Sequence, residues 1–492
     1  MPPASEPPVV SRARLHPDRI AILDGDRRHT YTELLEASER LAARLLDGRD
    51  SLHGARVVFD LPAGFDYVAA QWAIWRAGGI AVPVSPSATA AERGYLLEDT
   101  GAEVVISRSA HGDGLPRIDP RDPGERTATA LPSIDPAAAA MLLYTSGTTS
   151  RPKGVVSTHA GIAAQIGALC QAWQWTAEDR IPLFLPLHHI HGIINILGCA
   201  LWSGASVETF GKFSAEAVLP RVAGGAYTLF MAVPTIYAKL SQRLEKGGDE
   251  PAIEGFRALR LMVSGSSALP PTLLRKWRQL TGQTLLERYG MTETGMILSN
   301  PYEGERRSGT VGQPVPGMEV RLVQENGAIN EPGEPGEIQV RGPAVFQAYW
   351  ERPEATAEAF VDGWFRTGDL GIREDGYFRI LGRLSVDIIK SGGYKLSALE
   401  IEAAYLEHPA IHECAVVGVP DEVWGEAVAI AIVHGGPDGA PQLDELRDWG
   451  RERLSPYKLP RLLTVTDALP RNAMGKVAKR EVARLFPGPA DR

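Results

Sequence analysis

Residues 141–154 read MLLYTSGTTSRPKG, in which a short apolar run passes directly into a loop of hydroxyls and glycine that ends with one lysine. The apolar run has the length of a buried strand. Glycine lets backbone N–H groups approach an anion, hydroxyls donate hydrogen bonds and Lys153 supplies positive charge, so the loop suits a triphosphate. A Walker A loop needs Gly-Lys before Ser or Thr, whereas here Lys153 precedes Gly154. Taken alone, the loop is also compatible with a flexible Ser/Thr/Gly turn that binds nothing.

Apolar runs elsewhere in the chain alternate with longer amphipathic segments, including a helical pattern through Trp72 and Trp75. This alternation is typical of βαβ units and a parallel sheet. The region 310–346 differs, because Gly and Pro recur in it and it predicts antiparallel strands, which favours an appended β-region. The runs read as strands cover residues 56–61, 80–84, 104–107, 227–233, 259–264, 320–323 and 337–340.

A second change of pattern comes at GRLSVD, residues 382–387. About a hundred residues follow, the size of a small domain. They predict helices from about residue 397 and over 442–454, and strands over 413–419 and 427–433. We therefore predict an α/β protein with a large N-terminal domain (1–384), which carries the appended β-region, and a small mobile C-terminal α+β domain (385–492).

Composition excludes some classes of function. The formal net charge of −9 argues against general nucleic-acid binding, although it leaves room for a local basic pocket. Cys170, Cys199 and Cys414 form no C-x-x-C pair, which suits idle thiols in a reducing compartment. No signal peptide is visible, and the longest apolar run, 193–202, is shorter than the about 20 residues of a membrane span. We expect a cytoplasmic protein without a membrane partner, as a monomer or small homo-oligomer.

Further motifs follow the loop in order: ERYGMTET (287–294), WFRTGD (364–369), GR (382–383) and PRNAMGK (470–476). With residues 145–154 they resemble, over nearly the whole chain, the adenylate-forming superfamily of acyl-CoA synthetases, luciferases and peptide-synthetase adenylation domains. Five motifs in family order and spacing make coincidence a poor explanation. The resemblance implies an enzyme that activates a carboxylate with ATP as an acyl-adenylate.

The resemblance also implies the nucleotide site. The loop would hold the β- and γ-phosphates, Asp369 would accept from the ribose hydroxyls, and Tyr289 would flank adenine. Read singly, Asp369 also suits a turn. The ATP-binding residues implied are Thr145, Ser146, Gly147, Thr148, Thr149, Lys153, Ser266, Ser267, Ala268, Glu287, Arg288, Tyr289, Gly290, Met291, Thr292, Asp369, Arg383 and Lys476.

The implied catalytic residues are Lys476, Thr292, Glu293 and His189. Lys476 would stabilise charge between the carboxylate and the α-phosphate, which Thr292 would contact, although a Gly-Lys near a C-terminus also suits a solvated loop. Glu293, with Thr148, would bind Mg²⁺, because carboxylates suit hard cations and a bridging metal offsets charge on pyrophosphate.

The sequence departs from the family pattern at several positions. Ser150 stands where Gly is usual, and Lys479 replaces a common Arg. The stretch 383–392 is one residue longer than in many relatives. The hinge residue therefore stays open among Ser385, Val386 and Asp387.

The acid is indicated by polar residues at positions that are small or apolar in many relatives. His191, in PLHHIHG (186–192), and Arg288 resemble their counterparts in malonyl-CoA synthetases, and Ser266 and Met296 complete the implied acyl pocket. A buried cation is costly unless an anion meets it, so a second substrate carboxylate would explain the set. The alternatives are that Arg288 pairs with Glu287 or another nearby acid and that His191 packs in the core. The sequence does not distinguish malonate from methylmalonate as the substrate.

The acceptor is predicted to be coenzyme A, with Gly392, Gly393, Tyr394 and Lys395 forming its channel. The motif YKLP (457–460) resembles CoA ligases, and neither a carrier domain nor the amine-binding Asp of peptide synthetases is found. By resemblance, the small domain rotates between adenylation and thiolysis. The rivals are a ligase for short or aromatic monocarboxylates, a stand-alone adenylation enzyme that feeds a carrier protein, and a silent nucleotide-binding scaffold.

Overall fold

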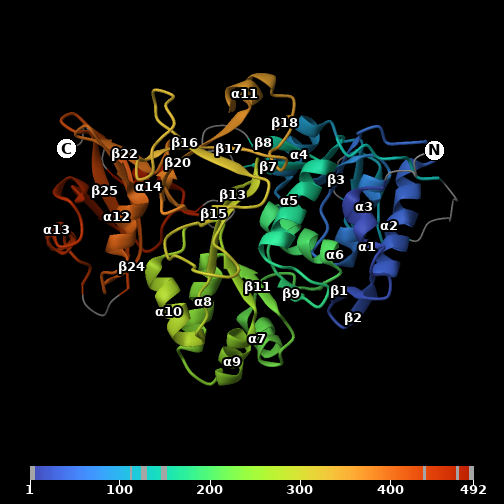
Figure 1. Cartoon of the computed structure of the whole chain (residues 1–492), viewed down its shortest axis with the longest axis horizontal. Helices are drawn as coiled ribbons and strands as arrows, with labels where there is room; N and C mark the ends of the chain where they lie inside the picture. The colour runs from blue at the N-terminus through green and yellow to red at the C-terminus, as the bar shows by residue number, and fades with distance from the viewer. Residues whose placement is uncertain are drawn as a thin grey trace.

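A computed structural model describes residues 6–110, 114–122, 130–145, 152–435, 439–471 and 476–486. It shows a large mixed α/β N-terminal part and a smaller C-terminal domain, which confirms the predicted fold class (Figure 1). The C-terminal domain, orange to red, lies opposite the blue N-terminal lobe. Within the described residues, no helix is both long and apolar enough to cross a membrane.

The N-terminal lobe is built on two sheets whose inner strands are short and apolar. The larger has the order β18-β8-β7-β4-β3-β5-β6, with parallel pairing from β7 through β6 and antiparallel pairing at β7–β8 and β8–β18. Its strands are β3 (Arg56–Phe59), β4 (Ile80–Pro83), β5 (Val104–Ile106), β6 (Arg117–Ile118), β7 (Ala139–Thr145), β8 (Lys153–Thr158) and β18 (Ala348–Tyr349). The smaller sheet holds β1 (Ile20–Asp24), β2 (Arg27–Thr30), β9 (Arg180–Leu183) and β10 (Ser206–Thr209).

Helices of this lobe begin at sequence caps. Thr30 and Thr89 each form a capping box with a glutamate three residues later, which satisfies N–H groups that the first helical turn leaves free. The helices are α1 (Pro8–Ala13), α2 (Tyr31–Leu46), α3 (Phe65–Arg76), α4 (Ala90–Thr100), α5 (His159–Ala172) and α6 (Cys199–Ser203), with the π-helix η1 (His191–Gly198) before α6.

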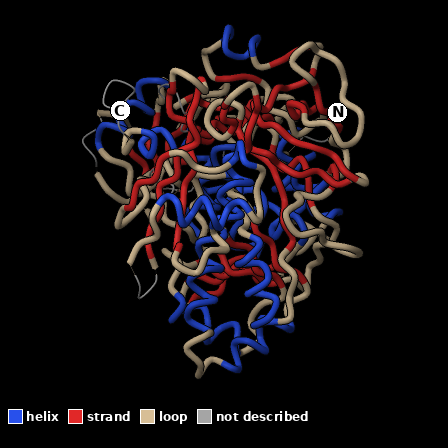
Figure 2. The backbone as a smooth tube through the Cα atoms, turned by 90° about the vertical axis from the view of Figure 1, so that its left-hand side faces the viewer, coloured by secondary structure: helices blue, strands red, loops and turns tan. Residues whose placement is uncertain are grey.

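A second lobe is built on a five-stranded sheet with the order β11-β12-β13-β14-β15. β11 (Leu229–Ala232), β12 (Leu261–Ser264) and β13 (Leu286–Met291) are parallel, and β14 (Gly295–Ser299) and β15 (Gln313–Pro314) continue antiparallel. Figure 2 shows the helices of this lobe gathered at the lower end of the molecule. They are α7 (Ala215–Ala223), α8 (Pro234–Leu244), α9 (Glu250–Ala258) and α10 (Pro271–Thr281).

The appended β-region and the C-terminal domain each form one sheet. The first contains β16 (Glu319–Val323), β17 (Gly336–Arg341), β19 (Phe360–Val361), β20 (Trp364–Glu374) and β21 (Tyr377–Arg383), near α11 (Pro353–Glu358). The second contains β22 (Ile388–Ser391), β23 (Tyr394–Ser397), β24 (Ile411–Asp421), β25 (Gly425–His434) and β26 (Leu462–Val465). Its helices are α12 (Ala398–Tyr405), α13 (Leu443–Arg451), η2 (Pro456–Lys458) and α14 (Lys479–Ala483). The two sheets are separate, and the predicted boundary at residue 384 falls between them.

Candidate active site

The turn after β12 holds two candidate side chains in place. Ser266 has a φ of 71°, a left-handed conformation that is uncommon outside glycine and concentrates at functional sites. Its Oγ lies 3.0 Å from His191 Nδ1. Gly265 packs so closely on the Arg288 guanidinium that no Cβ would fit. We call Arg288, His191, Ser266 and Gly265 the Arg288 pocket.

The Arg288 pocket contains buried donors that have no partner among the residues that the structure describes. Arg288 and His191 are each 5% exposed, and Arg288 Nε and Nη2 and His191 Nε2 make no hydrogen bond. Burial lowers the pKa of Arg288 to about 9, so the side chain stays cationic at neutral pH. Burial, followed by repulsion from Arg288 and Lys476, holds the pKa of His191 well below its usual range, so His191 is neutral. Buried donors without acceptors are costly, which indicates that a ligand supplies the acceptors.

Glu287 does not neutralise Arg288. Neighbouring residues on a strand point to opposite faces, and the Glu287 carboxylate instead accepts a hydrogen bond from Gly309 N at 3.1 Å. Burial raises the pKa of Glu287 to about 7. Of the alternatives considered for Arg288, the pairing with Glu287 is therefore wrong.

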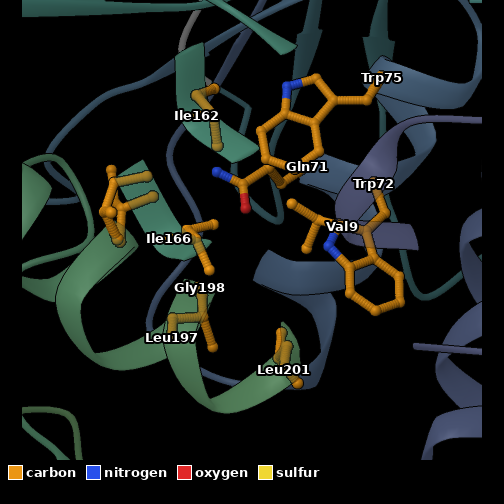
Figure 3. Close-up of a pocket in the computed structure, with 11 residues that line it drawn as sticks. Val9, Gln71, Trp72, Trp75, Ile162, Ile166, Leu197, Gly198 and Leu201 are labelled. Carbon is orange, nitrogen blue, oxygen red and sulfur yellow. The ribbon is translucent and has the colours of Figure 1, made fainter. Parts of the chain in front are cut away.

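His191 is the first residue of η1, whose face opposite the site packs against core side chains. Gly192 lies too close to the carbonyl oxygens of Leu185 and Pro186 to admit a side chain. Figure 3 shows the back of η1, where Gly198 faces Ile166. The cavity there holds about 10 Å³, room for about one water molecule and not for a substrate. The buried support fixes His191 from one side while Ser266 holds it from the other.

In a second set of site residues, both oxygens of one carboxylate already accept hydrogen bonds from protein side chains. Asp369 on β20 and Arg383 on β21 are cross-strand partners, and Arg383 Nε donates to Asp369 Oδ1 at 3.0 Å. Tyr289 OH donates to the other carboxylate oxygen, Oδ2. Burial lowers the pKa of Arg383, but Asp369, with Tyr289 and Glu293, raises it, and the net shift is upward. We call Asp369, Arg383 and Tyr289 the Asp369 cluster.

Tyr349 joins the end of the glycine loop to Glu293. The strands on either side of the loop, β7 and β8, pair antiparallel, and Thr145 pairs with Lys153. Lys153 Nζ lies 5.0 Å from the Tyr349 ring centroid, and Tyr349 OH donates to Glu293 Oε1 at 3.0 Å. Burial raises the pKa of Glu293. The predicted residues Ser146, Gly147, Thr148 and Thr149 lie outside the described residues.

Lys476 comes from the C-terminal domain and interacts electrostatically with members of both sets. Loss of water around its ammonium group, with repulsion from Arg383 and Arg288, lowers its pKa, and Asp369 opposes this effect. Burial, with His188 and Lys476, lowers the pKa of His189 to about 3, so His189 is neutral. Lys476 is thus the cation shared by the Arg288 pocket and the Asp369 cluster.

Other predicted site residues lie around this centre or away from it. Met296 is buried and packs against Gly290 on the paired strand. Met291 and Thr292 are half-buried, while Ser267 and Ala268 are exposed. Gly392, Gly393, Tyr394 and Lys395 form the β22–β23 hairpin outside the centre, with Tyr394 53% exposed and stacked 4.3 Å from Tyr457.

Comparison with known proteins decides the family. The model of the AMP-binding enzyme family matches residues 9–350, and that of the AMP-binding enzyme C-terminal domain matches residues 400–476. The chain belongs to the AMP-binding enzyme family. This AMP-binding enzyme is 42% identical to the Homo sapiens protein named malonate–CoA ligase ACSF3, mitochondrial, over 97% of its own length and 92% of that protein. It is 38% identical to the Arabidopsis thaliana malonate–CoA ligase, over 95% and 86% of the two chains.

Solved structures resemble this AMP-binding enzyme to different degrees. ATP-bound MatB from Rhodopseudomonas palustris gives a TM-score of 0.90 at 31% identity, covering 98% of this chain and 99% of that one. A malonyl-CoA ligase product complex with methylmalonyl-CoA and AMP gives a TM-score of 0.70 at 40% identity, covering 94% of this chain and 100% of that one. The relative that is closer in sequence therefore overlays less well.

Proposed function

We propose that this enzyme joins malonate to coenzyme A at the expense of ATP, through a malonyl-adenylate, and releases pyrophosphate and AMP. The observation that carries the proposal is the set of buried, unpartnered donors on Arg288 and His191. A distal carboxylate would accept from Arg288 through a two-pronged, charge-assisted contact, and from His191 Nε2. Here Ser266 OH would donate to Nδ1, which leaves the ring proton on Nε2. The names of the relatives support the same acid.

The first step needs the reacting carboxylate and the α-phosphate side by side. Lys153 would bind the outer phosphates, Asp369 would accept from the ribose hydroxyls, and Thr292 would contact the α-phosphate. The reacting carboxylate attacks the α-phosphorus, the bond to the bridging oxygen breaks and pyrophosphate leaves. Lys476, between Arg288 and Arg383, would stabilise the negative charge that builds up in this step.

Glu293 fits the magnesium ion that such a step requires. Magnesium is usually held by one or two carboxylates together with substrate phosphates, and the Glu293 carboxylate has a second oxygen besides the one that accepts from Tyr349. Within the described residues, no group of three or more His, Cys, Asp or Glu side chains makes a metal site of its own. When bound, the metal would offset charge on the leaving pyrophosphate.

The second step needs a route for the thiol of coenzyme A, which attacks the mixed anhydride and displaces AMP. We propose that the small domain, taken as residues 385–492, rotates so that Lys476 withdraws and the hairpin with Gly392, Gly393, Tyr394 and Lys395 lines the channel. The TM-score is lower with the methylmalonyl-CoA and AMP complex than with the ATP-bound structure. This difference supports two arrangements of the small domain relative to the large one. His189 would gate the acyl pocket. A cytoplasmic location stays a prediction.

A panel of acids tests the proposal. Malonate, methylmalonate, succinate, acetate, butyrate and benzoate are each supplied with ATP, Mg²⁺ and coenzyme A, and pyrophosphate and acyl-CoA are measured. We expect malonate to give the highest kcat/KM, with methylmalonate limited by the packing of Met296. A monocarboxylate in first place would contradict the proposal. Pyrophosphate release without acyl-CoA would indicate a carrier protein as the acceptor, and no pyrophosphate release from any acid would indicate a silent nucleotide-binding scaffold.

A further inference from the structure

Lys479, at the start of α14, occupies a buried site between two carboxylates. Its Nζ lies 2.8 Å from Asp387 Oδ1 and 2.7 Å from Glu402 Oε1, and the three side chains are 11–16% exposed. The two acids raise the pKa of Lys479 more than burial lowers it, so the lysine is charged at neutral pH. An ion held this far from water is fixed in position, because moving it would leave two buried carboxylates without their counter-ion.

Asp387 belongs to the segment that connects the two domains. Its second carboxylate oxygen, Oδ2, accepts from Arg383 N at 3.0 Å at the end of β21. Its backbone carbonyl accepts from Ala398 N, in the first turn of α12, at 2.8 Å. Gly382 has a φ of +136° and leaves no room for a Cβ beside Asp387. One carboxylate therefore contacts the large domain through one oxygen and Lys479 of the small domain through the other.

Through Arg383 and Lys479, the contacts of Asp387 connect the Asp369 cluster with the segment that carries Lys476. The Arg383 side chain pairs with Asp369, and Lys479 is three residues after Lys476. Val477 forms a bridge with Arg471, and Ala478 N donates to Pro470 O, so the segment between the two lysines is held as well.

The ion pairs that cross the domain boundary among the described residues are exposed. Arg275 pairs with Glu407, and Lys395 pairs with Glu325, but all four side chains are 41% exposed or more. Exposed pairs contribute about 0–1 kcal/mol. The buried contact of Asp387 is therefore the stronger candidate for fixing where the C-terminal domain presents Lys476.

We propose that Lys479 is a positioning residue for adenylation: by clamping Asp387 and Glu402 together, it holds the interdomain segment and the Lys476 segment as one unit and aims Lys476 at the site. The clamp serves the step in which Lys476 acts and leaves binding of ATP and acid to the large domain. This role rests on the proposed two-step reaction.

The test separates the two half-reactions in Lys479→Met. Adenylation is followed by pyrophosphate release in a single turnover with the acid that the wild type prefers. Thiolysis is followed with the prepared acyl-adenylate and coenzyme A. A misplacement of about 1 Å costs about 10²-fold in rate, so adenylation kcat should fall by about that factor while thiolysis and the KM values for ATP and acid change little. Lys479→Arg should restore most of the rate.

Controls distinguish positioning from loss of folding. Arg484→Met removes an exposed pair with Glu481 from the same helix and should leave both half-reactions unchanged. Lys479→Met should cost much less in an Asp387→Asn background, because contacts that act as one unit are not additive. If Lys479→Met does not fold, Asp387→Asn alone should still lose adenylation selectively.

Equal losses in both half-reactions, losses that follow the folded fraction, or full additivity with Asp387→Asn would overturn the proposal for Lys479. A wild type that releases no pyrophosphate with any acid would contradict the proposed function itself, so the two failures are distinct.

Discussion

The Arg288 pocket and the Asp369 cluster hold their polar groups in opposite ways. In the Asp369 cluster, Arg383 and Tyr289 both donate to one carboxylate, so the charges are satisfied before any ligand arrives. In the Arg288 pocket, Arg288 and His191 keep buried donors that meet no acceptor within the described part of the chain. A cluster that is already satisfied positions its ligand, whereas a pocket that is not satisfied selects the ligand that completes it.

The largest expected effect comes from removing the cation of the Arg288 pocket. Arg288→Ala should lower kcat/KM for malonate by up to about 10⁴-fold, because sites built around a polar partner reject analogues that leave it unpaired by about that factor. Butyrate, which has no distal carboxylate, should lose little activity or gain some. The measurement is kcat/KM for both acids. Equal losses for both would make Arg288 structural and remove the main support for a dicarboxylate.

Lys476→Ala removes the cation between the two sets, and it should slow adenylation by about 10²–10³-fold, as loss of a preorganised charge does. Thiolysis of supplied malonyl-AMP should be largely retained, because the proposal has Lys476 withdrawn by then. Pyrophosphate release and malonyl-CoA formation from malonyl-AMP are measured separately. Parallel losses would show that the lysine supports both steps.

Much of the fold could be predicted from the sequence. The strands at 56–61 and 427–433 were found because short apolar runs between amphipathic helices have few other solutions, and they correspond to β3 and β25. The π-helix η1 could not be predicted. Apart from Asn195, the run 193–202 has no polar side chain, so no periodicity marks its backbone. The close approach of Gly192 to the Leu185 and Pro186 carbonyls depends on tertiary packing.

The candidate site was predicted residue by residue but not as a set of contacts. Motifs point to Arg288 and Ser266, yet the fit of Gly265 on Arg288 follows from the β12–β13 register, in which Ser264 lies opposite Glu287. Tyr349 was missed, because it contacts Glu293 across 56 positions and stands in no motif. A signal for Gly265 was present, since the dipeptide Ser264-Gly265 directly after an apolar run marks a turn.

Gly265→Ala should reproduce the Arg288 effect on a smaller scale. The added methyl group would run into the guanidinium and push it aside, and overpacking costs about 1–3 kcal/mol, up to about 10²-fold in rate. We expect kcat/KM to fall more for malonate than for butyrate. The matched control is Gly211→Ala, where a Cβ meets nothing and both acids should behave as in the wild type. Equal sensitivity of the two acids would mean that the turn supports the whole site rather than Arg288.

The smallest effect should come from the Asp369 cluster, and it should lack selectivity for the acid. Asp369→Ala removes the predicted acceptor for the ribose hydroxyls, and a net hydrogen bond contributes about 0.5–1.5 kcal/mol, so KM for ATP should rise by about 2- to 10-fold. Tyr289→Phe, which removes only one donor to Asp369, should raise it less. The ranking of malonate over butyrate should stay that of the wild type, because neither change touches Arg288 or His191. KM for ATP and the acid panel are measured together. A changed ranking would show that the two sets are coupled through Lys476, and the contrast between a cluster that positions and a pocket that selects would then fail.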